Sequence, residues 1–443
     1  MGHLTPPTLQ TVDISLSGDN HSAKGYRPIH TYTTYDDIRG HVTISTLTRT
    51  LFSHIEVSLF GTTRTAHTDH TGPIIDEPHV THTFLRMAMP IPRSAYPSPS
   101  SSNDTYLFNP GCPLSIPFHF VVPARLLPYA CRHEHSSASV PEAHTQLPAS
   151  LGSFLLPRDD LAFELANVSY SIHAKLLGPS PTNKPSKTLA QATRRFHVLP
   201  ASEEAPPLLV LKESQYLLSK SKTMRKGMFG GNLGTITLTA SQPRAFSLPP
   251  PRICGPLVPS SPTDLTLTLH FDPTDPSCEP PRLGALSAWI RATTVHSINP
   301  ASRIPDQELG SPYDSHSRTF KACVELAAQD GPAVAAPLWR VVPAPKYARG
   351  DSGYSSAESL SPSPSPRSSS TPLAASMGLN VSVSAASANE DEDELGEMKP
   401  YYTTTITLRL ALAPSKTWIP TFHSCFVSRL YTLLLELVVH PPG

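Results

Sequence analysis

The sequence predicts an all-β protein of two tandem antiparallel β-sandwich lobes of immunoglobulin-like type, with a disordered insert rich in Ser and Pro. Three observations support this fold class. Apolar residues recur at every second position in many short runs, and a β-strand places such residues on one face. The chain contains 50 prolines in 443 residues, which is incompatible with long helices because an internal proline removes a backbone donor. The strand-like runs form two groups, divided by a Pro-rich stretch at Leu199 to Pro207, so two sandwiches in tandem are expected.

Alternating apolar runs define the strands of the first group. Val12, Ile14 and Leu16 would share one face of a strand. Polar and turn residues, including Gly40 and Gly61, are expected to separate neighbouring strands, as hairpin-rich proteins require. The other runs of this group are Val42 to Ile44, Ile55 to Leu59, Leu114 to Val122, Val168 to Leu176 and Arg194 to Val198.

The second group resumes the same pattern at Ile236 and Leu238, at Leu265 to Phe271 and at Ile406 to Leu412. Three stretches interrupt the strands and are expected to be loops or disordered. The longest contains ESLSPSPSPRSSSTP and an acidic run, a composition too polar to offset the entropy of folding. The three stretches are Pro90 to Asp104, Arg132 to Gln146 and Pro343 to Pro400.

The domain organisation follows from these groups. A chain of 443 residues is too long for one ordinary domain and suits two. We expect an N-terminal lobe over residues 8–200 and a C-terminal lobe that begins over 207–342 and ends over 399–443. The disordered Ser/Pro-rich and acidic insert occupies residues 343–398.

Composition excludes several classes of protein. Lys and Arg together number 35, as do Asp and Glu, so no net charge favours nucleic acid as a partner. Met1 to Leu16 contains no secretory signal, and the most apolar stretch, Leu430 to Val439, is too short to span a bilayer. The six cysteines are far apart and are expected to be free thiols. We therefore expect a cytoplasmic protein with at most peripheral membrane association.

The motifs that suggest chemistry are weak. GDSG at residues 350–353 resembles a serine-protease segment, but it lies in the insert, where no triad geometry can be held. No phosphate-binding Gly loop is found. Cys131, His133 and His135 lie close together, but without a second pair of ligands to complete a tetrahedral site. The sequence thus predicts no enzyme, no cofactor and no metal.

Two features indicate regulation or binding. Ser361, Ser363 and Ser365 each precede a proline in the insert and are candidate phosphorylation sites, where added negative charge can dock or recruit other groups. The second feature is a basic patch at the start of the C-terminal lobe, which can bind acidic tails or anionic lipid head groups. A solvated loop is the simpler interpretation of this patch. Its residues are Lys220, Lys222, Arg225 and Lys226.

The order of several segments resembles the arrestin family, specifically the fungal α-arrestin-like proteins. The resemblance covers most of the chain outside the inserts. In the N-terminal half it lies in YDDIRGHVTI (35–44), HIEVSLFG (54–61), PLSIPFHFVVPARLLPYAC (113–131), LPASLG (147–152) and VSYSIHAKL (168–176). In the C-terminal half it lies in RKGMFGGNLGTITL (225–238), PPRLGALSAWIRATTVHS (280–297) and IPTFHSCFVSRLYTLLLEL (419–437).

This resemblance implies a non-enzymatic adaptor that links membrane transporters or receptors to ubiquitin-dependent endocytosis and trafficking. Fungal members present Pro-Pro-x-Tyr or Leu-Pro-x-Tyr motifs to the WW domains of HECT-type ubiquitin ligases, and this chain contains neither motif. The nearest candidates are APKY, formed by Ala344, Pro345 and Tyr347 with the intervening lysine, and KPYY at 399–402, which is expected to be structural. The alternative is an arrestin-fold signalling scaffold without direct ligase contact, regulated by phosphorylation of the insert.

Overall fold

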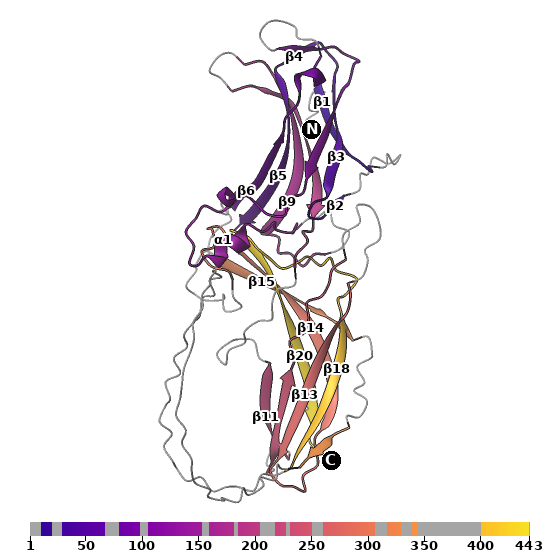
Figure 1. The fold of residues 1–443 in the computed structure, drawn as a ribbon, viewed down its shortest axis with the longest axis vertical. Coiled ribbons are helices and arrows are strands. Elements are labelled where there is room, and N and C mark those ends of the chain that lie inside the picture. The colour runs from indigo at the N-terminus through magenta and orange to yellow at the C-terminus, as the bar shows by residue number, and fades with distance from the viewer. Residues whose placement is uncertain are drawn as a thin grey trace, which may run out of the picture.

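Two β-sandwich lobes lie end to end in the computed structural model (Figure 1). The predicted all-β class of antiparallel sandwiches is confirmed. Among the described residues, no helix has the length and hydropathy needed to cross a membrane. The structure describes residues 10–19, 29–66, 79–97, 105–152, 159–180, 185–203, 218–226, 231–249, 260–305, 317–328, 338–343 and 400–442.

The N-terminal lobe packs a three-stranded sheet, in the order β1-β3-β8, against a five-stranded sheet, in the order β2-β10-β9-β5-β6, and a short pair β4-β7 adds to it. Pairing is antiparallel except between β2 and β10. The strands are β1 Gln10–Leu16, β2 Thr31–Tyr32, β3 Asp37–Thr46, β4 Thr50–Phe52, β5 His54–Ala66, β6 His79–Met89, β7 Tyr106–Phe108, β8 Leu114–Val121, β9 Ala166–Leu177 and β10 Thr188–Val198. The helical turns are η1 Arg93–Ala95, η2 Pro128–Ala130 and α1 Ser139–His144.

Alternation of side chains explains the core of this lobe. In β8, Ile116, Phe118 and Phe120 are buried while the residues between them are exposed, as expected for a strand with one face on the core. The central strand β9 buries Tyr170, whose hydroxyl donates a hydrogen bond to the backbone carbonyl of Pro148. Burying each large apolar side chain stabilises the lobe by roughly 1.5–3 kcal/mol, so the alternation is the main determinant of the sandwich.

The C-terminal lobe has the same two-layer plan. One sheet has the order β11-β12-β13-β18-β16, with β17 also paired to β18, and the other has the order β15-β14-β20-β19. Leucines of β13 and β18 meet Leu286, Ala288 and Ile290 of β14 in the core between the sheets. The strands are β11 Ser219–Arg225, β12 Asn232–Ala240, β13 Thr263–Pro273, β14 Arg282–Ser297, β15 Ser317–Glu325, β16 Ala327–Ala328, β17 Arg340–Val342, β18 Tyr401–Ala411, β19 Phe422–His423 and β20 Val427–His440.

The chain after residue 399 completes both sheets of the C-terminal lobe. Strand β18 pairs with β13 along its length, and β20 pairs with β14 from His296↔Val427 to Arg282↔His440. The segment expected to be a disordered insert separates these strands from the rest of the lobe. Apart from its first residue, Pro343, that segment lies outside the described residues.

Two local expectations are wrong. Gly40 and Gly61, expected between strands, lie inside β3 and β5. The stretch Arg132 to Gln146, expected to be a loop, contains α1.

Gly40 is required by close packing between strands. It lies on the central strand β3 of its sheet, opposite Leu16 of β1 and Phe118 of β8. A Cβ atom at this position would overlap the carbonyl oxygen of Ser15 and lie 2.6 Å from the Phe118 ring. Close backbone approach, rather than a positive φ angle, therefore explains the glycine.

We predict that Gly40→Ala lowers the free energy of unfolding by about 1–3 kcal/mol, because the added methyl group overpacks a filled core. Urea unfolding followed by tryptophan fluorescence measures this change. Gly231→Ala is the matched control, because a Cβ atom at Gly231 meets nothing within 4 Å. Equal stability of the two variants would contradict the packing argument.

Candidate functional site at the junction of the two lobes

The last residues of β14 and the first residues of β20 lie in the junction between the lobes. In Figure 1 these two strands run from the C-terminal lobe up to α1 and the N-terminal sheets. Strand β14 alternates along most of its length, but its last six residues, Ala292 to Ser297, are all buried or nearly so. Loss of alternation means that both faces of the strand are covered there, so the junction is an interior and not a surface contact.

The lobes share one hydrophobic core at this junction. Ile419, Phe422 and Val427 of the C-terminal lobe are buried within the apolar cluster of the N-terminal lobe. Thr65 of β5 donates a hydrogen bond of 2.8 Å to the backbone carbonyl of Ser297. The N-terminal core therefore includes residues from the last strands of the chain.

Arg429 is the central polar residue of the junction. Its side chain is fully buried in β20. The guanidinium donates hydrogen bonds to the backbone carbonyls of Asp160 and Leu161, the latter at 3.0 Å, and to the Thr294 hydroxyl at 2.9 Å. A buried charge requires such partners, and two of the three belong to the other lobe.

The segment that accepts these bonds is a strained turn. Leu161 has a φ of 58°, and the left-handed region costs a residue other than glycine roughly 1–2 kcal/mol. Its backbone N–H donates to the Asp159 carboxylate at 2.7 Å, and Lys416 of the C-terminal lobe donates to the same carboxylate at 2.8 Å. Hydrogen bonds from both lobes therefore fix the position of this turn.

The two carboxylates of this turn have opposite environments. The hydrogen bond from Lys416 is the main cause that holds the pKa of Asp159 below its usual range. Burial raises the pKa of Asp160, although hydrogen bonds from the backbone N–H groups of Gly152 and Ala162 and the charge of Arg429 oppose it. Asp160 is thus a buried acid whose oxygens orient the backbone on either side of the turn.

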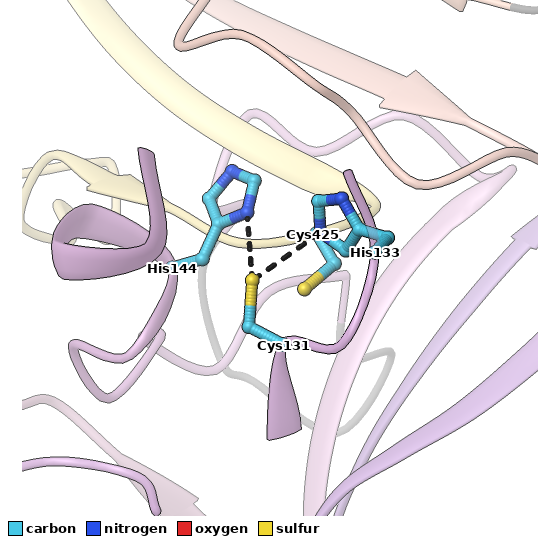
Figure 2. Close-up of side chains that lie close together, drawn as sticks. All are labelled: Cys131, His133, His144 and Cys425. Atoms are coloured by element: carbon cyan, nitrogen blue, oxygen red, sulfur yellow. Dashed lines mark hydrogen bonds between the residues drawn. The ribbon is translucent and has the colours of Figure 1, made fainter. Parts of the chain in front are cut away.

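A cluster of thiol and imidazole groups lies at the same junction (Figure 2). Cys131 follows the η2 turn, His133 is two residues further on, and His144 ends α1. Cys425 comes from the other lobe, between β19 and β20. The tertiary fold therefore joins one loop of the N-terminal lobe to one turn of the C-terminal lobe through these four side chains.

The donor atoms of this cluster converge. The Cys131 Sγ atom lies 3.3 Å from Nε2 of His133 and 3.5 Å from Nδ1 of His144, and Figure 2 shows it between the two rings with the sulfur of Cys425 beside it. One ligand atom from each of the four residues lies within 4.8 Å of the others. Cys131, His144 and Cys425 are buried, and His133 is half-buried.

Burial keeps these groups uncharged. Burial, aided by neighbouring histidines, lowers the pKa of His144 to about 4. Burial and the nearby Cys131 raise the pKa of Cys425 to about 12, and burial also raises the pKa of Cys131. A thiol with a raised pKa is a poor nucleophile, because the thiolate is the reactive form. The cluster is therefore poorly suited to covalent catalysis.

Only half of this cluster is recognisable from the sequence. Spacing groups Cys131 with His133 and His135 and offers no second pair. The Nε2 atom of His135 lies 3.9 Å from the Cys131 sulfur, but His144 and Cys425 complete the group of four. Cys425 approaches only through the docking of the lobes, which no spacing rule predicts. The sequence marks Arg429 only weakly, as the single charged residue within the apolar run CFVSRLYTLLL.

The basic patch of the C-terminal lobe lies on a strand and not on a loop. Lys220, Lys222 and Arg225 belong to β11, and these residues and Lys226 are exposed. Strand β11 is at the end of its sheet, and Lys220 and Lys222 stand opposite Leu238 and Ile236 of β12. Paired residues share a face, so the two lysines are on the core side of an edge strand. Such lysines discourage further strand pairing.

The other predicted site residues fall elsewhere. Ala344, Pro345 and Tyr347 of the candidate docking motif lie outside the described residues, as do Ser361, Ser363 and Ser365. Tyr402 of KPYY is structural, as expected, because it belongs to β18 and packs near Phe271 in the core of the C-terminal lobe.

Comparisons with known proteins add little to this picture. No family model matches the chain, and no curated protein matches it. A search of solved structures finds the sporulation control protein Spo0M from Bacillus subtilis, at 12% sequence identity and a TM-score of 0.23, over 60% of this chain and 79% of that chain. The strand pairing described above defines the fold.

We predict that Arg429→Met lowers the free energy of unfolding by about 3–5 kcal/mol, because removing the guanidinium leaves buried carbonyls without a donor. Urea unfolding measures the change, and hydrogen exchange at residues 159–163 tests whether the turn opens. Arg409→Met is the control, because Arg409 is exposed on β18 and its loss is expected to change stability by less than about 0.5 kcal/mol. Unaltered exchange in the Arg429 variant would contradict the assigned role.

We also predict that the double variant Lys220→Val and Lys222→Val self-associates, because an apolar edge strand can pair with a second copy. Analytical ultracentrifugation over a range of concentrations measures this. The matched variant, Lys220→Arg with Lys222→Arg, keeps both charges and should sediment as the parent does. If the valine variant also matches the parent, the two lysines do not protect the edge.

Proposed function

We propose that this chain is a non-enzymatic, arrestin-like adaptor that links membrane transporters or receptors to ubiquitin-dependent endocytosis and trafficking. The observation that carries the proposal is the joining of two β-sandwich lobes into one elongated body through a buried junction (Figure 1). A body of this kind offers long exposed surfaces for partners. Of the Cys and His groups at the junction, Cys131, His144 and Cys425 are buried and His133 is half-buried.

The segments that resemble the arrestin family coincide with the framework of this body. YDDIRGHVTI overlaps β3, VSYSIHAKL lies within β9, and IPTFHSCFVSRLYTLLLEL covers β19 and most of β20. These segments build the sheets and the junction. The resemblance therefore supports an arrestin-like fold. The choice of partner depends on other, exposed parts of the chain.

The APKY motif starts two residues after β17 ends. Val341 of β17 is 59% exposed and Leu338, just before this strand, is 86% exposed, so the chain enters the motif from the surface of the C-terminal lobe. Short proline-containing segments bind WW domains through aromatic-lined grooves. The exposure of the residues that precede the motif supports Ala344, Pro345 and Tyr347 as a degenerate docking motif for a HECT-type ligase.

A second candidate function is a signalling scaffold without direct ligase contact, regulated through Ser361, Ser363 and Ser365. The favouring observation is that β17 and β18, which flank the insert, pair with each other at Val342↔Tyr401. The strands on either side of the insert are thus paired within one sheet. Phosphate groups added there would change partner binding without breaking the fold.

The distinguishing prediction concerns the full chain and a panel of WW domains from HECT ligases. We expect micromolar-range binding, with a Kd on the order of 1–100 μM, that is lost in Tyr347→Ala because the tyrosine fills the WW groove. Isothermal titration calorimetry measures it. Tyr354→Ala is the matched control, because Tyr354 follows in the same segment but outside the motif.

Failure of every WW domain to bind would contradict ligase docking through this motif and would favour the signalling scaffold. In that case, replacing Ser361, Ser363 and Ser365 by Ala should change the partners recovered by crosslinking from cells. Recovery of neither a ligase nor a transporter or receptor would contradict the trafficking role.

A further inference from the structure

We infer that Cys131, His133, His144 and Cys425 bind one Zn²⁺ ion, which joins the loop between β8 and β9 of the N-terminal lobe to the turn between β19 and β20 of the C-terminal lobe. The inference stands on the geometry of the four side chains and is independent of the proposed adaptor function. It concerns residues that no sequence motif brings together.

The distances between donor atoms fit a tetrahedral ion. Zinc bonds of about 2.3 Å to sulfur and about 2.0–2.1 Å to nitrogen place a sulfur and a nitrogen ligand roughly 3.5–3.6 Å apart in a tetrahedron. The Cys131 sulfur lies 3.3 Å from the His133 Nε2 atom and 3.5 Å from the His144 Nδ1 atom. All four ligand atoms lie within 4.8 Å of one another, so a small contraction around the ion completes the site.

The types of ligand select zinc. Two thiolates and two imidazoles in tetrahedral arrangement are a preferred set for Zn²⁺, whereas Mg²⁺ and Ca²⁺ prefer oxygen ligands. Three of the four residues are buried, and four protein ligands leave no open position for a substrate. The site is therefore structural rather than catalytic.

Neighbouring groups orient the ligands. The His133 Nδ1 atom lies 3.0 Å from the Glu134 carbonyl, so its N–H donates there and the Nε2 lone pair faces the site. The Cys425 backbone carbonyl accepts a hydrogen bond of 2.7 Å from Ala301. The Cys131 N–H donates to Pro128 at 3.2 Å and closes the η2 turn. The backbone at both cysteines is thus held in place before an ion binds.

A disulfide between Cys131 and Cys425 is the competing explanation for two adjacent sulfurs. A disulfide needs only the two sulfur atoms, at about 2.05 Å, and gives the two histidines no role. In the structure both cysteines are free, and nitrogen atoms of two imidazoles approach one of the sulfurs. The convergence of both rings on this atom favours the ion over the disulfide.

An ion here would connect the lobes next to the Arg429 hydrogen bonds. Cys425 and Arg429 are separated by a few residues on the same side of the junction, and Cys425 Sγ also donates to the Ala130 carbonyl at 3.7 Å. Loss of one ligand would remove one connection between the β8–β9 loop and the turn before β20. Metal binding and docking of the lobes would therefore be coupled.

The test is the metal content of the full chain, purified under reducing conditions without chelator or metal-affinity resin. We expect zinc equimolar with protein by inductively coupled plasma mass spectrometry, and loss of that zinc in both Cys131→Ser and Cys425→Ser. Cys323→Ser is the matched control, because Cys323 is exposed on β15, and this variant should retain the ion. A chelator should lower the melting temperature of the parent and of Cys323→Ser only.

Cobalt substitution of the parent chain keeps the test decisive if the serine variants fail to fold. Co²⁺ held by two thiolates and two imidazoles should give intense tetrahedral d–d bands and a thiolate charge-transfer band, and added Zn²⁺ should abolish them. Three outcomes would overturn the inference. They are no zinc and no cobalt spectrum in the parent, zinc retained in both cysteine variants, or a Cys131–Cys425 disulfide found by mass spectrometry of the reduced preparation.

Discussion

The fold of this protein depends on satisfying one buried charge. Arg429 is fully buried at the start of β20, and no apolar surrounding could accept it without hydrogen-bond partners. Two of those partners are consecutive backbone carbonyls of the opposite lobe, at Asp160 and Leu161. The strand that completes the C-terminal lobe can therefore reach its buried position only when the N-terminal lobe presents its turn.

This constraint makes the two sandwiches a single unit. The N-terminal apolar core includes Ile419, Phe422 and Val427, which lie in the sequence after β18 and up to the first residue of β20 in the C-terminal lobe. Strands β18 and β20 are also central in the C-terminal sheets. Neither lobe is complete without the last 40 or so residues, so we expect long-range pairing to limit the rate of folding.

Alternation along the chain was enough to predict the fold class and most long strands, because burial on one face of a sheet acts locally on every second residue. It predicted β1, β8 and β13 but not β6, β14, β15 or β20. It also did not predict β11, whose sequence SKSKTMR is polar because an edge strand needs little burial. Nor did it predict that Cys425 meets Cys131. That contact depends on how two finished lobes dock, which no local pattern encodes. Gly40 was assigned to a turn because glycine signals both turns and close packing, and only the neighbouring strands distinguish the two.

The chemistry of the junction also explains why the lobes have one relative orientation. An apolar interface tolerates small sliding movements, because hydrophobic attraction is not directional. The Arg429 guanidinium is planar and its donors have a fixed geometry, so two successive carbonyls and the Thr294 hydroxyl define the angle as well as the distance. The hydrogen bond and ion pair between Lys416 and Asp159 add a second fixed point on the same turn. A surface that spans both lobes would then be presented to a partner as one preformed shape. Binding of the partner would not incur the entropic cost of fixing the angle between the lobes.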